Sequence, residues 1–194
     1  MSHSLTSPRT VHPLPGDLVV WIFILAELTV FSIFFIAYAF VRLNHPDLFA
    51  QGFAHLNRTA GAINTLALIT SSYFVVRAVI DIHQDNPKGC SRWLNRAILM
   101  GAIYVVVKLW EYYEAFSAGY GLSTNAFYMF YFLLTFFHFF HVLLGLLVLI
   151  LISRNARRGR YQGEGVVVVE SGACYWHMID LLWIILFPLV YVLN

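Results

Sequence analysis

Five long apolar stretches restrict what this sequence can fold into. Each is long enough to cross the hydrocarbon core of a bilayer, which takes about 20 mostly apolar residues in a helix. Only helices and closed β-barrels can span that core, because every backbone polar group there needs a partner within the protein. The stretches are continuous and lack the alternating pattern of barrel strands, which excludes a barrel. We therefore predict an all-α, polytopic membrane protein with a bundle of five transmembrane helices, at about residues 18–43, 60–82, 94–113, 126–153 and 172–193.

The charge content agrees with a membrane protein. Of the 194 residues, 60% are hydrophobic and 11% are charged, against roughly 25% charged in a soluble domain. So few charged side chains could not cover the surface of a soluble domain of this size. The formal net charge of +2 is too small to indicate nucleic acid as a partner.

Basic residues predict the orientation of the five spans. Lysines and arginines gather on the cytoplasmic side of membrane proteins. One side of this chain holds Arg9, Arg77, Lys88, Arg92, Arg96, Arg154, Arg157, Arg158 and Arg160, whereas the other holds Arg42 and Arg58. The N-terminus is therefore expected in the cytoplasm and the C-terminus in the periplasm of a bacterial inner membrane.

Residues 1–16 are expected to be a disordered cytoplasmic lead before one five-helix domain over residues 17–194. Cys90 and Cys174 fall near the reducing cytoplasmic side, so we expect no disulfide.

Ionisable side chains inside the spans are the candidate functional groups, because burying them in lipid is costly. Glu27 lies about 15 Å along the first helix from Asp17, near the middle of the bilayer. There it is expected to be protonated or hydrogen-bonded to another helix. His138 and His141 are three residues apart, as are His177 and Asp180, so each pair shares a helix face. We predict one buried polar network comprising Glu27, His138, His141, His177 and Asp180.

A second set of side chains is predicted to have structural or partner-facing roles: Asn64, Lys108, Glu111, Glu114, Trp176 and Trp183. Within it, Lys108 and Glu111 are spaced to form an ion pair along one helix. A basic cluster after the fourth span is predicted to contact anionic headgroups: Arg154, Arg157, Arg158 and Arg160. The aromatic run 127–132 is predicted to form a belt at the membrane interface. The run 166–169 either begins the last helix early or lies against the membrane surface.

A metal centre is the competing hypothesis for the buried groups. Helix bundles bind two irons through several inward carboxylates and Glu-x-x-His motifs. Here Glu27 is alone at the right depth, and two histidines three residues apart cannot supply both axial ligands of one haem. We therefore predict no catalytic residues, no metal ligands and no cofactor-binding residues.

Five short motifs occur in order along the chain. They are Ala26-Glu27-Leu28, Asn64-Thr65, Glu111-Tyr112-Tyr113-Glu114, Phe137-His138 followed by His141-Val142 and Gly145, and Tyr175-Trp176-His177 followed by Asp180 and Trp183. Together they resemble subunit III of the heme-copper oxidase superfamily in its five-helix form. The resemblance covers about residues 15–194.

The resemblance implies an accessory subunit without haem or copper of its own. Such a subunit packs against a catalytic heme-copper subunit, in a complex that also has an electron-input subunit, and supports assembly, lipid packing and turnover. Pro15-Gly16-Asp17-Leu18 and Asn64-Thr65-Leu66-Ala67-Leu68 are most similar to the nitric-oxide-reductase-associated branch. A cytochrome c or quinol oxidase is the other expected complex. Seven-helix members have two more N-terminal helices that complete a lipid cleft, so phospholipid here is expected in a groove shared with a neighbour.

Two alternatives from other classes stay open on the sequence alone. One is a self-sufficient membrane metalloenzyme that uses the buried Glu, His and Asp groups. The other is a small transporter, although no span is broken by proline or glycine near its middle and the chain shows no internal repeat.

Overall fold

The computed structural model describes residues 15–54, 56–161 and 163–192, and all the elements in these ranges are helical. Five of the described helices are long and apolar enough to cross a membrane. They are α1 (Leu18–Asn44), α3 (Arg58–His83), α4 (Pro87–Ser117), α5 (Ala126–Arg157) and α6 (Val166–Phe187), the last continued by the π-helical turn η2 (Pro188–Val192). The predicted all-α bundle of five candidate transmembrane helices is confirmed. The expected lead falls mostly on residues 1–14, which lie outside the described residues.

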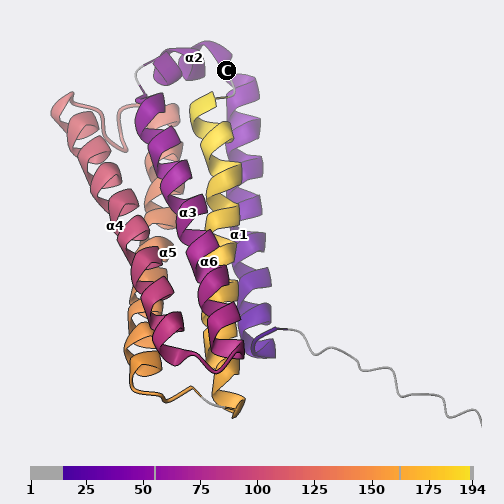
Figure 1. Cartoon of the computed structure of the whole chain (residues 1–194). Coiled ribbons are helices and arrows are strands. Elements are labelled where there is room, and N and C mark those ends of the chain that lie inside the picture. Colours follow the sequence, from indigo (N-terminus) through magenta and orange to yellow (C-terminus); the bar gives the residue numbers. More distant parts are fainter. Residues whose placement is uncertain (1–14, 55, 162, 193–194) are drawn as a thin grey trace, which may run out of the picture.

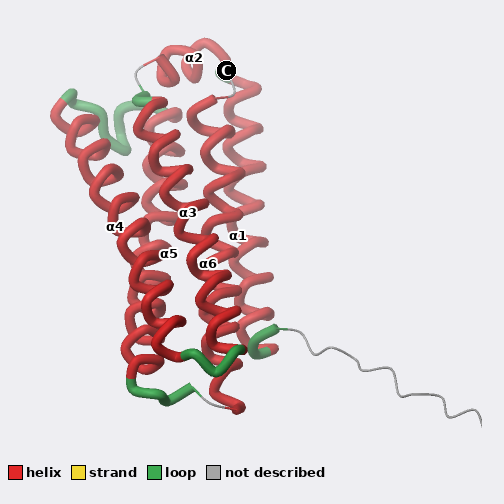
Figure 2. The backbone as a smooth tube through the Cα atoms, in the orientation of Figure 1, coloured by secondary structure: helices red, strands yellow, loops and turns green. Residues whose placement is uncertain are grey.

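Four of the long helices form a ring and the fifth lies outside it. Around the ring the helices follow their order in the chain. Helix α3 packs on α4, α4 on α5, α5 on α6, and α6 on α3. Helix α1 lies along the outside of this ring, against α5 and α6, and forms one edge of the molecule (Figures 1 and 2). The short helix α2 (Pro46–Ala54) lies across the end of the bundle where α1 finishes.

Helix α1 packs through a single narrow stripe. Its buried residues are Ile24, Phe31 and Tyr38, which recur every seven positions and so face the same way. Other apolar side chains point outward, with exposed fractions of 61% for Leu25 and 69% for Ile36. A continuous apolar face of this kind is suited to lipid or to another membrane subunit.

Two glycines allow α4, α5 and α6 to approach closely around Trp176, which is completely buried. A Cβ atom on Gly101 of α4 would lie 3.0 Å from the Trp176 ring, and one on Gly145 of α5 would lie 2.9 Å from it. Small residues at helix interfaces are the usual means of close packing in membranes. The indole thus occupies space that side chains at these two positions would fill.

The structure differs from the sequence predictions at both ends of the bundle. Helix α6 begins at Val166, so the run 166–169 is helical and does not lie along the surface as a separate segment. Helix α2 was not predicted.

The interface-belt prediction for residues 127–132 is wrong, because only Met129 of the run is exposed and the other five side chains are buried. Phe49 and Phe53 of α2 pack on the Phe127 ring, with centroids 5.5 and 5.4 Å away, and Phe116 of α4 stacks on Phe132 at 4.9 Å.

Candidate functional site

Glu27 and His141 join α1 to α5. The Glu27 Oε2 and His141 Nε2 atoms lie 3.1 Å apart, and the two side chains are 19% and 11% exposed. The rings of Phe31 and Phe137 pack on the imidazole, with centroids 5.5 and 4.8 Å away. The contact is therefore largely shielded by aromatic groups.

The second nitrogen of His141 shows how protons are arranged in this pair. His141 Nδ1 lies 2.7 Å from the carbonyl oxygen of Phe137, and a carbonyl only accepts hydrogen bonds, so Nδ1 carries a hydrogen. The bond to Glu27 then needs one further proton. Either a neutral carboxyl group donates to Nε2, or an imidazolium donates to a carboxylate. In both arrangements the pair has no net charge, which suits its place within the span.

His138 makes a different set of contacts and does not join Glu27. Its Nε2 lies 3.1 Å from the carbonyl oxygen of Ile179, so Nε2 donates, and its Nδ1 accepts a bond from the Tyr104 hydroxyl at 3.0 Å. His138 is completely buried and links α5 to α4 and α6. The two histidines point about 60° apart around α5, since three residues turn a helix by about 300°.

The motif at the end of the chain links α6 to α3. His177 Nδ1 and the Ser72 hydroxyl are hydrogen-bonded at 2.6 Å, and Trp183 Nε1 donates to the Thr65 hydroxyl at 2.9 Å. Asp180 follows one turn after His177, and its Oδ1 is buried without a hydrogen-bond partner. The predicted five-residue network is therefore divided into separate interhelical contacts.

Asn64 of α3 is completely buried, and both polar atoms of its amide lack a hydrogen-bond partner in the described part of the chain. It belongs to the set predicted to have structural or partner-facing roles, and the structure shows it inside the bundle.

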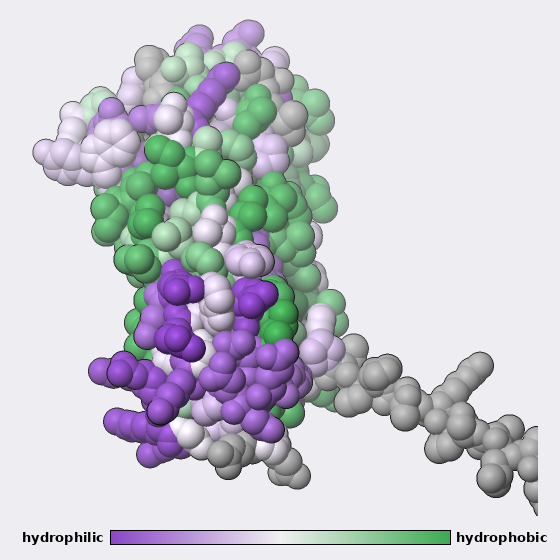
Figure 3. Space-filling model, in the orientation of Figure 1, coloured by the Kyte–Doolittle hydropathy of each residue, from purple (hydrophilic) through white to green (hydrophobic). Residues whose placement is uncertain are grey.

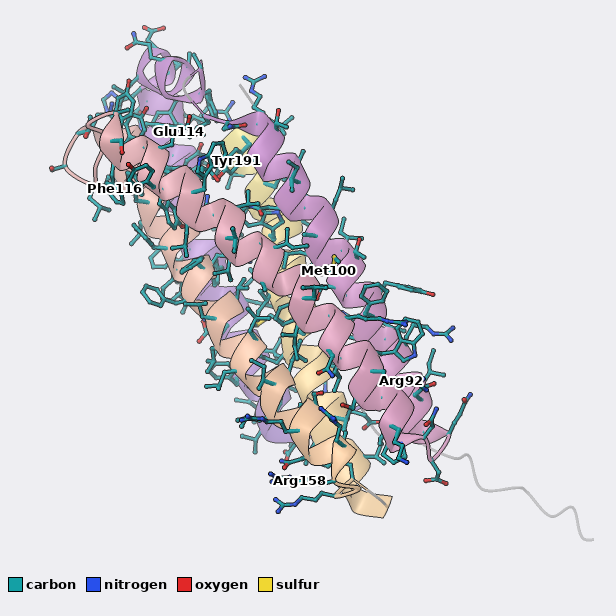
Figure 4. The ribbon with its side chains drawn as sticks, turned by 60° about the vertical axis from the view of Figure 1, so that its left-hand side comes forward. Arg92, Met100, Glu114, Phe116, Arg158 and Tyr191 are labelled. Atoms are coloured by element: carbon teal, nitrogen blue, oxygen red, sulfur yellow. The ribbon has the colours of Figure 1, made fainter. Side chains whose placement is uncertain are left out.

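Lys108 and Glu111 form an ion pair within the ring of helices, with Nζ 3.2 Å from Oε2 and no exposure of the lysine. Lys108 also donates to the Tyr191 hydroxyl at 2.6 Å. Glu111 Oε1 accepts bonds from the hydroxyls of Tyr131 and Tyr191, at 2.7 and 2.6 Å. This cluster links α4 to α5 and to the turn η2. Tyr191 lies near the end of the bundle where α4 finishes (Figure 4). Glu114 is exposed and lines a cavity of about 430 Å³, which Glu111 and Tyr131 of the cluster also line.

The phenols were the polar groups that sequence reasoning missed. Tyr104 precedes Lys108 by four residues and Glu111 by seven, so all three share one face of α4, and this spacing was visible in the sequence. Tyr191 had no comparable signal, since it lies in the π-helical turn after Pro188.

The predicted headgroup residues Arg154, Arg157, Arg158 and Arg160 are all exposed at the end of α5. This end of the molecule is strongly hydrophilic, whereas a broad apolar band covers the middle (Figure 3). Among residues 15–54, 56–161 and 163–192, no three His, Cys, Asp or Glu side chains are grouped so that they could hold a metal ion.

Comparison with known proteins identifies the family. The model for "Cytochrome c oxidase subunit III" matches residues 16–194. A "Cytochrome c oxidase subunit 3" from Thermostichus vulcanus is 33% identical over 174 residues, covering 89% of this chain and 85% of that protein. The protein of the same name from Synechocystis sp. is 33% identical over 173 residues, with 89% and 73% covered. The one from Corynebacterium diphtheriae is 28% identical over 175 residues, with 89% and 85% covered. The chain therefore belongs to the cytochrome c oxidase subunit III family, the accessory and non-catalytic subunits of heme-copper oxidase complexes, which carry no haem or copper of their own.

Proposed function

We propose that this chain stabilises the catalytic subunit of a respiratory heme-copper reductase in a bacterial inner membrane, with its N-terminus in the cytoplasm. The observation that carries the proposal is the outward face of α1, which is apolar along the helix while only Ile24, Phe31 and Tyr38 are buried. Part of this face is the proposed surface for the catalytic subunit, and lipid would cover the rest. The nine-to-two bias of basic residues supports the orientation.

A fused relative supports direct contact with the catalytic subunit. "Heme-copper oxidase subunit I+III" from Aeropyrum pernix is 29% identical over 191 residues, covering 92% of this chain and 23% of that protein. Its name places subunits I and III in one polypeptide. Such a fusion requires the two parts to lie near each other, and we infer the same neighbourhood for this chain.

The buried polar groups have a structural role in this proposal. Glu27 with His141 holds α1 on the ring, while His138, His177 and the Lys108 cluster hold the ring helices together. Hydrogen bonds between helices in lipid contribute about 0.6–2 kcal/mol each. Together they would keep α1 and its outward face in the position that the catalytic subunit requires.

Phospholipid is the proposed ligand of an apolar groove of about 620 Å³ between α1, α5 and α6. Its walls include Phe23, Val148 and Ile152, and Asn155 of α5 lies close in sequence to the basic residues that end this helix. Acyl chains would occupy the groove, while Arg154, Arg158 and Arg160 would contact anionic headgroups.

We assign the complex to the nitric-oxide-reductase-associated branch on the motifs at residues 15–18 and 64–68. The first motif includes the N-cap of α1, because the Asp17 side chain accepts a hydrogen bond from the backbone N–H of Val19 at 2.8 Å. The second candidate is a cytochrome c or quinol oxidase, which the names of the relatives favour. Membership of an accessory, non-catalytic family opposes the metalloenzyme and transporter hypotheses.

Purification through an affinity tag on this chain, in a mild detergent, tests the proposal. We expect a haem-bearing catalytic subunit and its electron-input subunit to co-purify, and the complex to consume nitric oxide. A complex that consumes only oxygen would support the second candidate. The absence of any haem protein from a purified sample that contains the intact tagged chain would contradict the proposed function.

A further inference from the structure

A polar cavity of about 720 Å³ opens between the start of α4 and the end of α5. It lies on a different face from the apolar groove, because α1 and α6 contribute nothing to its walls. Its lining consists of Asn86, Lys88, Ser91, Arg92, Asn95 and Arg157. Arg92 lies near the same end of the bundle as Arg158, which follows the last residue of α5 (Figure 4). The cavity is thus at the end of the membrane-spanning region.

Three cations face this cavity without a counter-ion. The ion pairs among the described residues involve Lys108, His83 and His141, and none involves Lys88, Arg92 or Arg157. Asp81 is nearby, but it accepts a bond from Asn86 at 3.4 Å and packs against Gly89, and it is not part of the lining. The cavity therefore has an uncompensated positive charge.

The other arginines at this end of α3 and α4 have a different partner. Arg77 and Arg96 lie over the ring of Trp93, at 5.3 and 4.3 Å from its centroid. Neither lines the cavity. The lining cations are therefore distinct from those that pack on the indole.

A buried serine orients the amide of Asn95. Ser153, which is 2% exposed, donates to Asn95 Oδ1 at 2.7 Å, a shorter contact than the 3.3 Å from its hydroxyl to the backbone carbonyl oxygen of Ser91. Because the single Ser153 proton is used in this way, Ser91 donates to the Ser153 hydroxyl at 2.9 Å. This arrangement fixes the carbonyl of the Asn95 amide and leaves its two N–H donors unused by other described residues.

The geometry points to a binding site for a phosphate ester, formed by Lys88, Arg92, Arg157 and the amide of Asn95. Guanidinium groups bind phosphate oxygens through paired hydrogen bonds, and the lysine adds a point charge. Basic pockets between helices at the cytoplasmic side of membranes commonly take anionic lipid headgroups. A free phosphate compound has the same chemistry, so the source is a matter for experiment. The site does not depend on which reductase the chain serves.

The test compares two double variants that lose the same charge. Arg92→Gln with Arg157→Gln removes two cations from the cavity, whereas Arg77→Gln with Arg96→Gln removes two that pack on Trp93 and do not line it. The complex containing each variant is delipidated and titrated with phosphatidylglycerol in neutral nanodiscs, and bound lipid is counted by native mass spectrometry. A second titration uses inorganic phosphate in neutral detergent, followed by calorimetry.

We expect the cavity variant to bind the probe about tenfold more weakly than the wild type, and the control variant to bind within about twofold of it. Loss confined to phosphatidylglycerol identifies a lipid headgroup as the ligand, and loss that includes inorganic phosphate identifies a small phosphate compound. If the two double variants bind each probe with the same affinity as one another while the complex stays intact, the assignment is overturned.

Discussion

Replacing Glu111 by Gln is expected to destabilise the helix bundle by about 3–5 kcal/mol, the usual cost of leaving one member of a buried ion pair alone. The substitution keeps an oxygen that can accept from Tyr131 and Tyr191, and it changes the other atom to an amide donor. That donor then faces the Lys108 ammonium, whose Nζ lies 3.2 Å from the carboxylate oxygen in the native protein. Unfolding of the purified complex in mixed micelles, followed by tryptophan fluorescence, measures the loss.

The matched control is the double variant Lys108→Met with Glu111→Gln. It removes both charges and keeps the acceptor for the two phenols, so we expect it to recover more than half of the lost stability. If the free energy of unfolding of Glu111→Gln is within about 1 kcal/mol of the wild-type value, the two charges are not coupled. The same conclusion follows if the double variant is no more stable than Glu111→Gln alone.

Replacing Glu27 by Ala is expected to reduce the yield of assembled complex about threefold or more, because one or two kcal/mol of local stability changes abundance severalfold. The substitution leaves Nε2 of His141 without its partner at 3.1 Å and releases α1 from α5. The initial rate per haem should stay within about twofold of the wild type, since Glu27 stabilises the subunit and takes no part in the chemistry. Haem content after purification and rapid initial-rate measurement provide the two values.

The control for this effect is Glu27→Gln. Its amide can donate to Nε2 of a His141 that keeps the hydrogen on Nδ1, so the bond between α1 and α5 is retained. We expect a yield close to that of the wild type. An initial rate that falls to zero in Glu27→Ala complexes of normal haem content would contradict the accessory role.

The division of the polar residues into separate contacts shows how far the sequence predicts this structure. Spacing places His138 and His141 on one broad helix face, but which neighbour each one meets depends on the packing order of five helices. Since the two side chains diverge by about 60°, one reaches into the ring and the other reaches α1. No pattern in a single sequence contains that packing order.

The presence of five spans was easier to predict than their exact bounds or the surroundings of their ends, since α4 begins at Pro87 where the sequence placed the span at 94–113. Apolar length alone identifies a transmembrane helix, which is why five spans were recognisable. The run 127–132 has the composition of an interface belt, yet α2 covers Phe127 through Phe49 and Phe53, and Phe116 of α4 stacks on Phe132. Composition describes which side chains favour an interface, whereas burial here depends on α2, which begins at Pro46 beside the turn after α1, and on the packing of α4 against α5.

The most direct test of the account is the reductase purified from cells that lack this chain. If the chain stabilises the catalytic subunit and takes no part in the chemistry, the first turnovers per haem should proceed within about twofold of the intact complex. Activity should then decay faster than in the intact complex, and adding the wild-type chain during assembly should restore the slower decay. A haem-replete complex that shows no reduction from the first turnover would contradict this role.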